Sequence, residues 1–412
     1  MSVVSAGPEY RRFLTRMSAV AGRGILLGLD RVNAALDKLG RPDKSTCCVQ
    51  VAGTNGKGSV CAMVEAMGLA AGLRVGLFSS PHLARFTERI RITGSEVDGE
   101  RLGALLDRID ATAVPLTYFE ISLVLALLVM VEDGVELAVL ETGLGGRLDA
   151  VTAAEVQVTA VTMIGLDHTQ ILGPDLLSIA QEKAAIARPG VPMVVGMGNP
   201  PEIVQLVSET AQRVGAPVVF PQSLEDRGLG SIPLSLSGVH QRDNAAIACA
   251  VFDRASRFLG LSFPVSVHSA GLSRVKWPGR CESVGSVLFD GAHNPQGAAI
   301  LATVVNEMPL AIRPTQILVG ISADKDVAGI LSALAGAFAR IAVTSLGPRP
   351  MPIADLADAA SLAGFSEVLT VPDPIEWIVR AGSARFPVAV AGSLFLVGPL
   401  RAALLGEAID PF

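Results

Sequence analysis

A short glycine-rich stretch with a single lysine, GTNGKGS at residues 53–59, has the composition of a phosphate-binding loop. The apolar, β-prone residues before it predict a strand, and the residues after it predict a helix. A turn of this kind directs backbone N–H groups and a helix N-terminus at an anion. Lys57 would add a positive charge for a phosphate oxygen, and Ser59 would add a hydroxyl for Mg²⁺. Val51 stands where the common phosphate loop has its first glycine, so the alternative is a glycine-rich turn with an exposed lysine.

Three polar side chains elsewhere follow apolar segments that are typical of strands. Glu141 follows residues 137–140, and a carboxylate there suits Mg²⁺, which prefers a few oxygen ligands; its alternative role is a capping or salt-bridging acid. Asp290 ends a similar segment, where a carboxylate can accept hydrogen bonds from ribose hydroxyls. His168 lies beside Asp167 after a third segment, and a lone histidine is as often a hydrogen-bonded structural residue.

The residue type alone does not indicate a role for two cationic residues, because that role depends on what surrounds them. Lys183 lies in a predicted helix at residues 176–187 that should cover the sheet, and a lysine on such a helix is most often solvated. Arg280 follows Pro278-Gly279, and an arginine there could reach phosphates across a cleft or form an interdomain salt bridge. The chain has no G-x-S-x-G elbow and no C-x-x-C pair, which makes nucleophilic hydrolysis and a zinc centre poor interpretations.

The elements that must position these residues alternate between strands and helices. We expect strands at 47–51, 75–78, 137–140, 156–163, 191–195 and 218–219, with helices at 59–71, 100–110, 117–132, 176–187, 202–214 and 238–260. A second alternation has expected strands at 287–290, 316–319, 341–343, 368–371 and 388–391. Alternation of this kind predicts an α/β fold with parallel, doubly wound sheets, and ligands of such sheets gather at the carboxyl ends of the strands.

The pattern breaks near Trp277, which predicts a domain boundary there. A length of 412 residues also exceeds what a single core usually supports. We therefore predict a P-loop-containing doubly wound parallel sheet domain at residues 1–277, followed by a smaller doubly wound α/β domain at residues 278–412.

The composition limits the classes of protein to which this chain can belong. Half of the residues are apolar, only 17% are charged, and the net charge of −6 gives no reason to expect a nucleic-acid surface. The longest apolar run, residues 121–131, is too short to span a bilayer. The five cysteines show no metal spacing, which indicates reduced, mostly buried thiols. We expect a cytoplasmic protein that binds neither nucleic acid nor membrane.

Many short motifs in a fixed order resemble those of the folylpolyglutamate synthase and dihydrofolate synthase family, within the Mur-ligase superfamily. The resemblance spans nearly the whole chain. The matching motifs are GTNGKGS at 53–59, SSPHL at 79–83, TYFE at 117–120, ETGLGGRLDA at 141–150, LDHT at 166–169, EKAAI at 182–186, HQxxNAA from His240, PGR at 278–280, DGAHNP at 290–295, DKD at 324–326 and GSLFLVG at 392–398.

The resemblance implies a role for each matching position. The ATP-binding residues would be Thr54, Asn55, Gly56, Lys57, Gly58, Ser59, Asn244, Arg280 and Asp290. The Mg²⁺ ligands, for one or two ions, would be Ser80, Glu141 and His168. The catalytic residues would be Lys57, Lys183, His168 and His293, with Lys183 carried as a carbamate. The residues that touch the pterin substrate would be Thr117, Tyr118, Phe119, Glu120, Leu148, Asp149 and Ala150.

The implied activity is an ATP-dependent amide ligase. It would add L-glutamate to dihydropteroate, to folates, or to both, through an acyl phosphate, with ATP, L-glutamate and a pteroate or folate as substrates and a monomer as the working state. Val151-Thr152 replaces the Thr-Asn that is usual in the family, which bears on the choice of acceptor. The alternatives are a Mur-type ligase for another acid and amine, and a P-loop nucleotide-binding protein without ligase activity.

Overall fold

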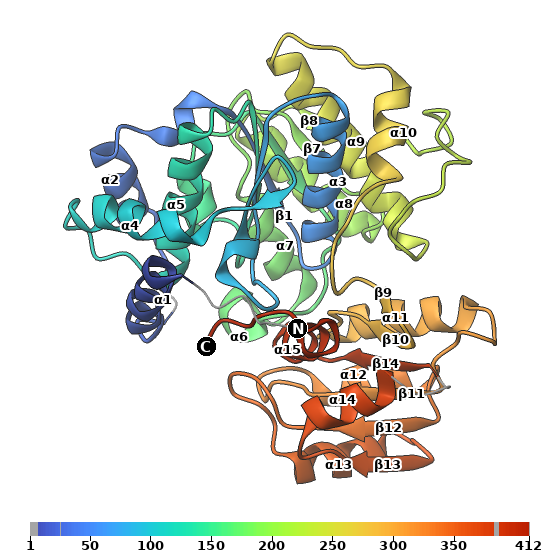
Figure 1. Ribbon diagram of the computed structural model, residues 1–412. Helices are drawn as coiled ribbons and strands as arrows, with labels where there is room; N and C mark the ends of the chain where they lie inside the picture. Colours follow the sequence, from blue (N-terminus) through green and yellow to red (C-terminus); the bar gives the residue numbers. More distant parts are fainter. Residues whose placement is uncertain (1–6, 25, 383–386, 412) are drawn as a thin grey trace.

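The computed structural model describes residues 7–24, 26–382 and 387–411. Within these ranges the chain forms two α/β units, each built on its own sheet (Figure 1). The last helix of the first unit ends at Leu272, and the first strand of the second begins at Glu282. The expected α/β architecture is confirmed.

The first unit contains an eight-stranded sheet with the order β4-β3-β2-β5-β1-β6-β7-β8. Its central strands are apolar and buried on both faces, as parallel strands covered by helices must be. The strands span β1 (Cys47–Ala52), β2 (Val75–Phe78), β3 (Ile90–Ile92), β4 (Ser95–Glu96), β5 (Leu137–Glu141), β6 (Val158–Val161), β7 (Met193–Val195) and β8 (Val218–Val219).

Helices cover both faces of this sheet, because alternate side chains of each strand point to opposite sides. In β1, Cys48 packs into one hydrophobic core, whereas Val49 and Val51 pack into the other. One face carries α1 (Pro8–Ala21), α2 (Asp30–Lys38), α4 (Leu102–Asp110), α5 (Tyr118–Glu132), α7 (Leu176–Ala184) and α8 (Pro201–Arg213). The other face carries α3 (Lys57–Ala70), α9 (His240–Phe258) and α10 (Val265–Leu272).

Short helical segments complete the first unit. They are α6 (Thr169–Leu172) and the 3₁₀ turns η1 (Pro42–Ser45), η2 (Phe86–Arg89), η3 (Gly99–Arg101) and η4 (Ala150–Ala153). The SSPHL segment follows β2 in the chain, and η2 and the β3–β4 hairpin come next. Because β3 lies beside β2 in the sheet, the hairpin forms the edge of the sheet next to this segment.

The second unit contains a six-stranded sheet with the order β13-β12-β11-β14-β10-β9. The strands span β9 (Glu282–Val284), β10 (Val287–Phe289), β11 (Gln316–Val319), β12 (Arg340–Val343), β13 (Glu367–Thr370) and β14 (Val388–Ala391). One face packs against α11 (Pro295–Glu307), α12 (Val327–Ala335) and α13 (Ile353–Leu362). The other face packs against α14 (Pro374–Gly382) and α15 (Leu394–Leu405).

Strand register brings the polar loops of the first unit to one edge. β1 pairs in parallel with β5, with Val51 opposite Glu141, and with β6, with Ala52 opposite Val161. The loops that follow β1, β5 and β6 therefore emerge side by side. The order in which the chain adds strands also changes direction at β1, with β2 and β5 on one side and β6 to β8 on the other, and ligands of doubly wound sheets bind at such a point.

The sheets differ from the expected parallel arrangement at their edges. β3 and β4 form an antiparallel hairpin beside β2, and β9 runs antiparallel to β10. These strands are two or three residues long and join their neighbours through tight turns, so the alternation of strands and helices does not reveal them.

Two further expectations concern the chain as a whole. Within the described ranges, no helix has the length and apolar character needed to cross a membrane. The five cysteines are free thiols, and all except Cys281 are buried.

Candidate functional site

The glycine-rich loop turns sharply between β1 and α3. Gly53 has φ +151° and Gly56 has φ +88°, backbone conformations that L side chains rarely adopt. A Cβ atom on Gly53 would collide with Thr162 Oγ1, and one on Gly56 would lie 2.5 Å from Asn244 Oδ1. Glycine is therefore required at both positions for the loop to pack against β6 and α9.

The N-terminus of α3 leaves backbone donors for an anion. No side chain caps the helix, and Val60 N closes its first turn onto Gly56 O, so the N–H groups of residues 57–59 lie outside the helical ladder. Lys57 Nζ folds back to donate to Gly53 O and Thr54 O, both at 3.1 Å. This loop fits a phosphate group, which needs donors and positive charge at a helix N-terminus.

A cavity of about 190 Å³ opens in front of the loop and receives residues from both units. All of the predicted catalytic, ATP-binding and metal-binding residues line it, although they come from separate strands, loops and helices of both units. They are Thr54, Asn55, Gly56, Lys57, Gly58, Ser59, Ser80, Glu141, His168, Lys183, Asn244, Arg280, Asp290 and His293.

Glu141 places a buried carboxylate at the rim of the loop. Its Oε2 atom accepts a hydrogen bond from Ser80 N at 3.2 Å. Burial raises the pKa of Glu141, although Lys57 and the Ser80 N–H group oppose the shift. Within the described residues, no three His, Cys, Asp or Glu side chains form a metal cluster. The Glu141 carboxylate and the Ser80 hydroxyl are oxygen donors of the kind that Mg²⁺ combines with waters and substrate phosphates. His168 lines the same cavity, and the metal-binding role of the three residues stays a prediction.

Lys183 is a buried lysine with one hydrogen-bond acceptor. It is 5% exposed, and its Nζ atom donates to Gly53 O at 2.8 Å. Burial lowers the pKa of Lys183 to about 7, and the neighbouring charge of Lys57 acts in the same direction. A large fraction of this amine is thus neutral at physiological pH, unlike the amine of a solvated lysine.

Asp167 joins the two units by ion pairs. Its Oδ2 atom lies 3.3 Å from His293 Nε2, and its Oδ1 atom accepts hydrogen bonds from Lys325 Nζ and, at 2.8 Å, from His168 N. Burial alone would raise the pKa of Asp167, but the hydrogen bond with His293 and the charge of Lys325 contribute to holding it well below its usual range. Burial lowers the pKa of His168, which favours the neutral ring that can bind a metal.

The second unit also holds the glycine-rich loop through side-chain amides. Asn55 Nδ2 donates to Gln296 Oε1 at 2.7 Å, and Asn294 Nδ2 donates to Asn55 Oδ1 at 3.1 Å. The backbone N–H groups of Thr54 and Asn55 both donate to Met163 O. The Asn55 side chain thus connects the loop to the second unit. Asn55 also lines the cavity, as the ATP-binding prediction expects, but the contacts of its side chain are with the second unit.

Asp290 and Arg280 form the wall contributed by the second unit. Asp290 Oδ2 accepts from Cys281 N at 2.9 Å and lies 3.3 Å from Cys281 Sγ, and its Oδ1 atom accepts from Ala292 N at 2.8 Å. Arg280 NH1 donates to Gly279 O at 3.0 Å and packs against Gly291. The carboxylate is held in a fixed orientation at the carboxyl end of β10.

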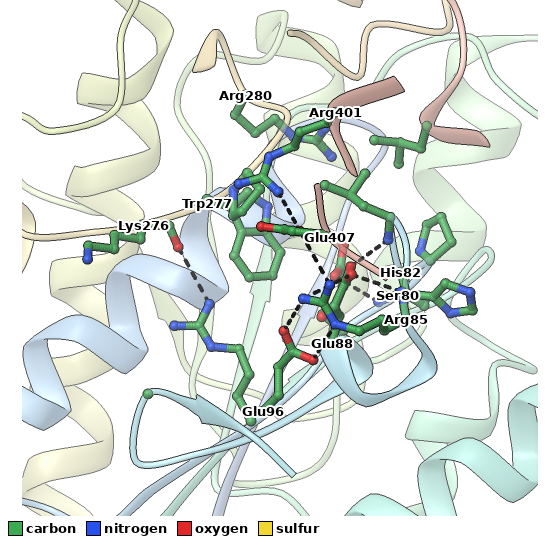
Figure 2. Close-up of a pocket in the computed structure, with 18 residues that line it drawn as sticks. Ser80, His82, Arg85, Glu88, Glu96, Lys276, Trp277, Arg280, Arg401 and Glu407 are labelled. Atoms are coloured by element: carbon green, nitrogen blue, oxygen red, sulfur yellow. Dashed lines mark hydrogen bonds and ion pairs between the residues drawn. The ribbon is translucent and has the colours of Figure 1, made fainter. Parts of the chain in front are cut away.

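A second cavity of about 330 Å³, whose lining residues are drawn in Figure 2, shares part of its wall with the first. It lies between the segment after β2, the linker at Lys276–Arg280 and the end of α15. The two cavities share Ser80, Pro81, Glu141, Arg280 and Leu394 in their walls. A molecule in the second cavity can therefore present one end beside Glu141 in the first.

Charged side chains and one aromatic ring line the second cavity. Arg85 NH2 donates to Glu96 Oε1 at 2.7 Å, and Arg85 NH1 lies 3.3 Å from Glu407 Oε2 (Figure 2). Arg401 NH1 lies 3.2 Å from the same carboxylate of Glu407. Trp277 adds a flat apolar surface to this polar lining. The cavity offers both stacking and charge pairing to a ligand.

The residues predicted to touch the pterin lie outside both of these cavities. Thr117 caps α5 and accepts a hydrogen bond from Glu120 N at 3.4 Å, while Glu120 Oε1 pairs with Arg31 NH2 at 2.8 Å. Asp149 is buried and accepts from Leu144 N at 2.8 Å. The other predicted contacts are neighbours of these residues in the chain: Tyr118 and Phe119 lie in the first turn of α5, and Leu148 and Ala150 flank Asp149 at the start of η4. Their contact with substrate stays a prediction.

Two family models match this chain. The model of the Mur ligase middle domain matches residues 51–252, and the model of the dihydrofolate synthetase C-terminal domain matches residues 274–403. The dihydrofolate synthase/folylpolyglutamate synthase of Escherichia coli is 36% identical over an alignment of 346 residues, and the alignment covers 79% of each chain. The chain belongs to this synthase family.

Solved structures of the family agree with this fold over almost the full length. The structure described as E. coli FolC in complex with DHPP and ADP has a TM-score of 0.85 and 30% identity, and it covers 98% of this chain and 99% of its own. A bifunctional folylpolyglutamate synthase/dihydrofolate synthase with Mn, AMPPNP and L-glutamate bound has a TM-score of 0.84 and 32% identity, and it covers 98% of this chain and 100% of its own.

Several residues of the site were not predicted as functional. Asp167 and Lys325 lie in the LDHT and DKD motifs, so the motifs marked their segments without indicating their contact. Asn294 and Gln296 begin α11, where a capping role would be the ordinary expectation. No pattern in the sequence pointed to Arg85 or Arg401, since isolated arginines are common on protein surfaces.

Proposed function

We propose that the protein is an ATP-dependent ligase that adds L-glutamate to dihydropteroate, to folates, or to both. The observation that carries the proposal is the single cavity in which the nucleotide loop, the Glu141 carboxylate and the buried Lys183 amine meet residues of the second unit. The ligands named for the two solved structures support this proposal: DHPP and ADP in the first, and Mn, AMPPNP and L-glutamate in the second.

The reaction proceeds in two steps. A carboxylate oxygen of the acceptor attacks the γ-phosphorus of ATP, the bond to the β–γ bridging oxygen breaks, and ADP leaves. The amine nitrogen of glutamate then attacks the acyl carbon, inorganic phosphate leaves, and the nitrogen loses a proton to form the amide. Lys57 and the N–H groups at the start of α3 stabilise negative charge on the transferred phosphoryl group.

The metal site that we propose uses Ser80, Glu141 and His168. A Mg²⁺ ion bound there would neutralise charge on the phosphate oxygens. Glu141 and Ser80 are already held together by the hydrogen bond between Ser80 N and Glu141 Oε2. The two units enclose the reacting atoms and exclude water, which would otherwise hydrolyse the acyl phosphate.

We assign the second cavity to the acceptor. Its shared wall with the nucleotide cavity allows a carboxylate to approach Glu141 and Ser80 while the rest of the molecule lies along Trp277. Arg85 and Arg401 already share Glu407, so an acceptor carboxylate can compete for either guanidinium. The predicted pterin contacts at Thr117–Glu120 and Leu148–Ala150 form the competing location for the aromatic end of the acceptor.

Further details complete the proposal. Lys183 acts as a carbamate, because a neutral amine is the form that adds carbon dioxide and the product is an anion beside a metal site.

The domain boundary lies between residues 277 and 278. The working enzyme is a cytoplasmic monomer without a nucleic-acid or membrane partner, and light scattering after size exclusion checks its mass.

The experiment offers each acceptor separately. Purified protein is incubated with ATP, Mg²⁺ and L-glutamate, together with dihydropteroate, dihydrofolate or tetrahydrofolate. Released phosphate and the product mass are then measured. A mass increase by one glutamyl residue, with one phosphate released for each amide, is the expected result. The proposal fails if none of the three acceptors yields a glutamylated product.

A further inference from the structure

The DKD motif at residues 324–326 has no role in the chemistry described above. It lies in the loop after β11, and Asp326 caps α12 by accepting a hydrogen bond from Gly329 N at 2.9 Å. The Lys325 side chain points away from solvent, with 13% exposed, and donates to Asp167 in the other unit. Lys325 does not line the cavity in front of the glycine-rich loop, whereas its partner Asp167 does, so Asp167 is the residue through which Lys325 contacts the cavity wall.

Asp167 also contacts two histidines on the cavity wall. Its Oδ1 atom accepts the His168 backbone N–H, which holds a turn where His168 has φ +50°. Its Oδ2 atom lies 3.3 Å from His293 Nε2. His293 Nδ1 also lies 2.7 Å from Gly291 O, so both nitrogens of the ring have an oxygen partner and the ring plane is set.

We infer that Lys325 is a positioning residue for the ligation reaction, acting through Asp167 to hold His168 and His293 in their orientations at the cavity. The inference rests on the proposed ligase function. Asp167 is 8% exposed, and a buried carboxylate that loses a cationic partner rotates or recruits water to compensate. Either change displaces the acceptor oxygens that His168 N and His293 Nε2 now use.

The competing explanation is an ordinary ion pair that only stabilises the contact between the units. A neighbouring cation provides the matched control. Arg349 pairs with Asp324 at 3.8 Å in the same loop region, but its side chain is 78% exposed and it has no contact with Asp167. Lys325→Met and Arg349→Met each remove one positive charge next to the DKD motif, and only the first removes the contact with Asp167.

The test compares these variants in the full chain by kinetics and by imidazole ¹⁵N NMR. We expect Lys325→Met to lower kcat by about 10- to 100-fold, the range typical of residues that orient catalytic or metal ligands. The KM for ATP and the Kd for ADP without metal should stay near the wild-type values, because the loop after β1 is unchanged. The signals of His168 and His293 should shift in this variant and not in Arg349→Met.

A second pair of variants keeps the test decisive if Lys325→Met folds poorly. Lys325→Arg retains a cation and should recover most of the lost kcat. Adding Lys325→Met to Asp167→Asn should produce little further loss, since both act through one contact. Wild-type kcat and unchanged histidine signals in Lys325→Met would overturn the inference, as would additive losses. If the wild-type protein itself makes no product, the proposed function fails, whereas the NMR comparison still tests the contact.

Discussion

Lys183 shows how burial changes the chemistry of one residue. Replacing it by alanine should lower the rate of ligation on the order of 10²-fold, the effect expected when a group that stabilises phosphoryl transfer is lost. The Kd for ADP should remain close to that of the wild type, because Lys57 and the N–H groups of α3 are retained. Phosphate release and calorimetric titration with ADP measure the two effects.

Chemical rescue separates a carbamate at Lys183 from an ammonium. A small carboxylate such as acetate can replace the lost anion in Lys183→Ala, and we expect it to restore part of the activity, whereas methylamine should not. Lys44→Ala, at a lysine whose side chain is 56% exposed, is the control and should behave as the wild type. Full activity of Lys183→Ala without any additive would contradict the proposed role.

Glu65 is a buried acid on α3 that should make stability depend on pH. Burial raises the pKa of Glu65 from 4.5 to about 7, while Arg91, 3.0 Å away, opposes the shift. The folded state then binds this proton more tightly than the unfolded chain does. The resulting stabilisation is fully present below pH 4.5 and is lost as the pH rises through about 7.

Glu65→Gln removes this titration, so the test compares slopes and not absolute stabilities. The decline in the free energy of unfolding between about pH 5 and pH 8 should be smaller in the variant, by on the order of 2 kcal/mol. Urea unfolding at a series of pH values measures the difference. Glu202→Gln, at an exposed position on α8, should leave the slope unchanged. Parallel curves for wild type and Glu65→Gln would show that Glu65 is not the titrating group.

At the scale of elements, the nucleotide loop depends on backbone conformation as much as on Lys57. Gly56→Ala places a Cβ atom in a left-handed conformation and 2.5 Å from Asn244 Oδ1. The conformational strain alone costs about 1–2 kcal/mol. Because the same residue caps α3, the loop must also shift, and we expect the affinity for ADP to fall by at least about tenfold, which corresponds to 1.4 kcal/mol.

Gly72→Ala isolates the contribution of strain. Gly72 follows the other end of α3, has φ +79°, and has open space where a Cβ would be. Thermal unfolding should therefore show a loss of stability in both variants, while titration with ADP should show weaker binding in Gly56→Ala alone. Equal ADP affinity in the two variants would mean that the close packing of the loop against α9 does not contribute to the binding of ADP.

At the scale of the whole molecule, the end of the chain returns to the first unit (Figure 1). Asp410 N donates to Ala84 O at 2.9 Å, and Asp410 Oδ2 accepts from Phe86 N at 2.6 Å and from the Tyr10 hydroxyl. These contacts connect the segment after α15 to α1 and to the 3₁₀ turn η2. The tail thus joins the two units on the side of the second cavity.

Removing the Asp410 carboxylate should loosen this connection. Asp410→Ala leaves a buried backbone donor and a tyrosine hydroxyl without their acceptor, which should cost about 2–4 kcal/mol. Limited proteolysis should then cleave the tail faster, and thermal unfolding should begin at a lower temperature. Asp358→Ala, at an exposed position on α13, should change neither measurement. Equal proteolysis rates in the two variants would exclude the tail as a structural connection.

The sequence alone was sufficient for the main helices and parallel strands and for many of the residues that line the first cavity. The loop at residues 53–59 is recognisable because its glycines, lysine and serine are contiguous, so local chemistry defines it. Glu141 and Asp290 were found because parallel strands deliver their carboxyl ends to one edge. β2, β11 and β14 lie at the predicted residues, since buried strands with flanking turns give a clear local signal.

The tertiary structure decided which distant residues meet. Lys325 and Asp167 are 158 positions apart, and their contact depends on how the two sheets dock, which no local pattern encodes. The same docking directs the Asn55 side chain to Asn294 and Gln296. Short antiparallel edges such as β3–β4 were invisible for a related reason: two or three residues carry too little periodicity, and their pairing with β2 supplies the stability.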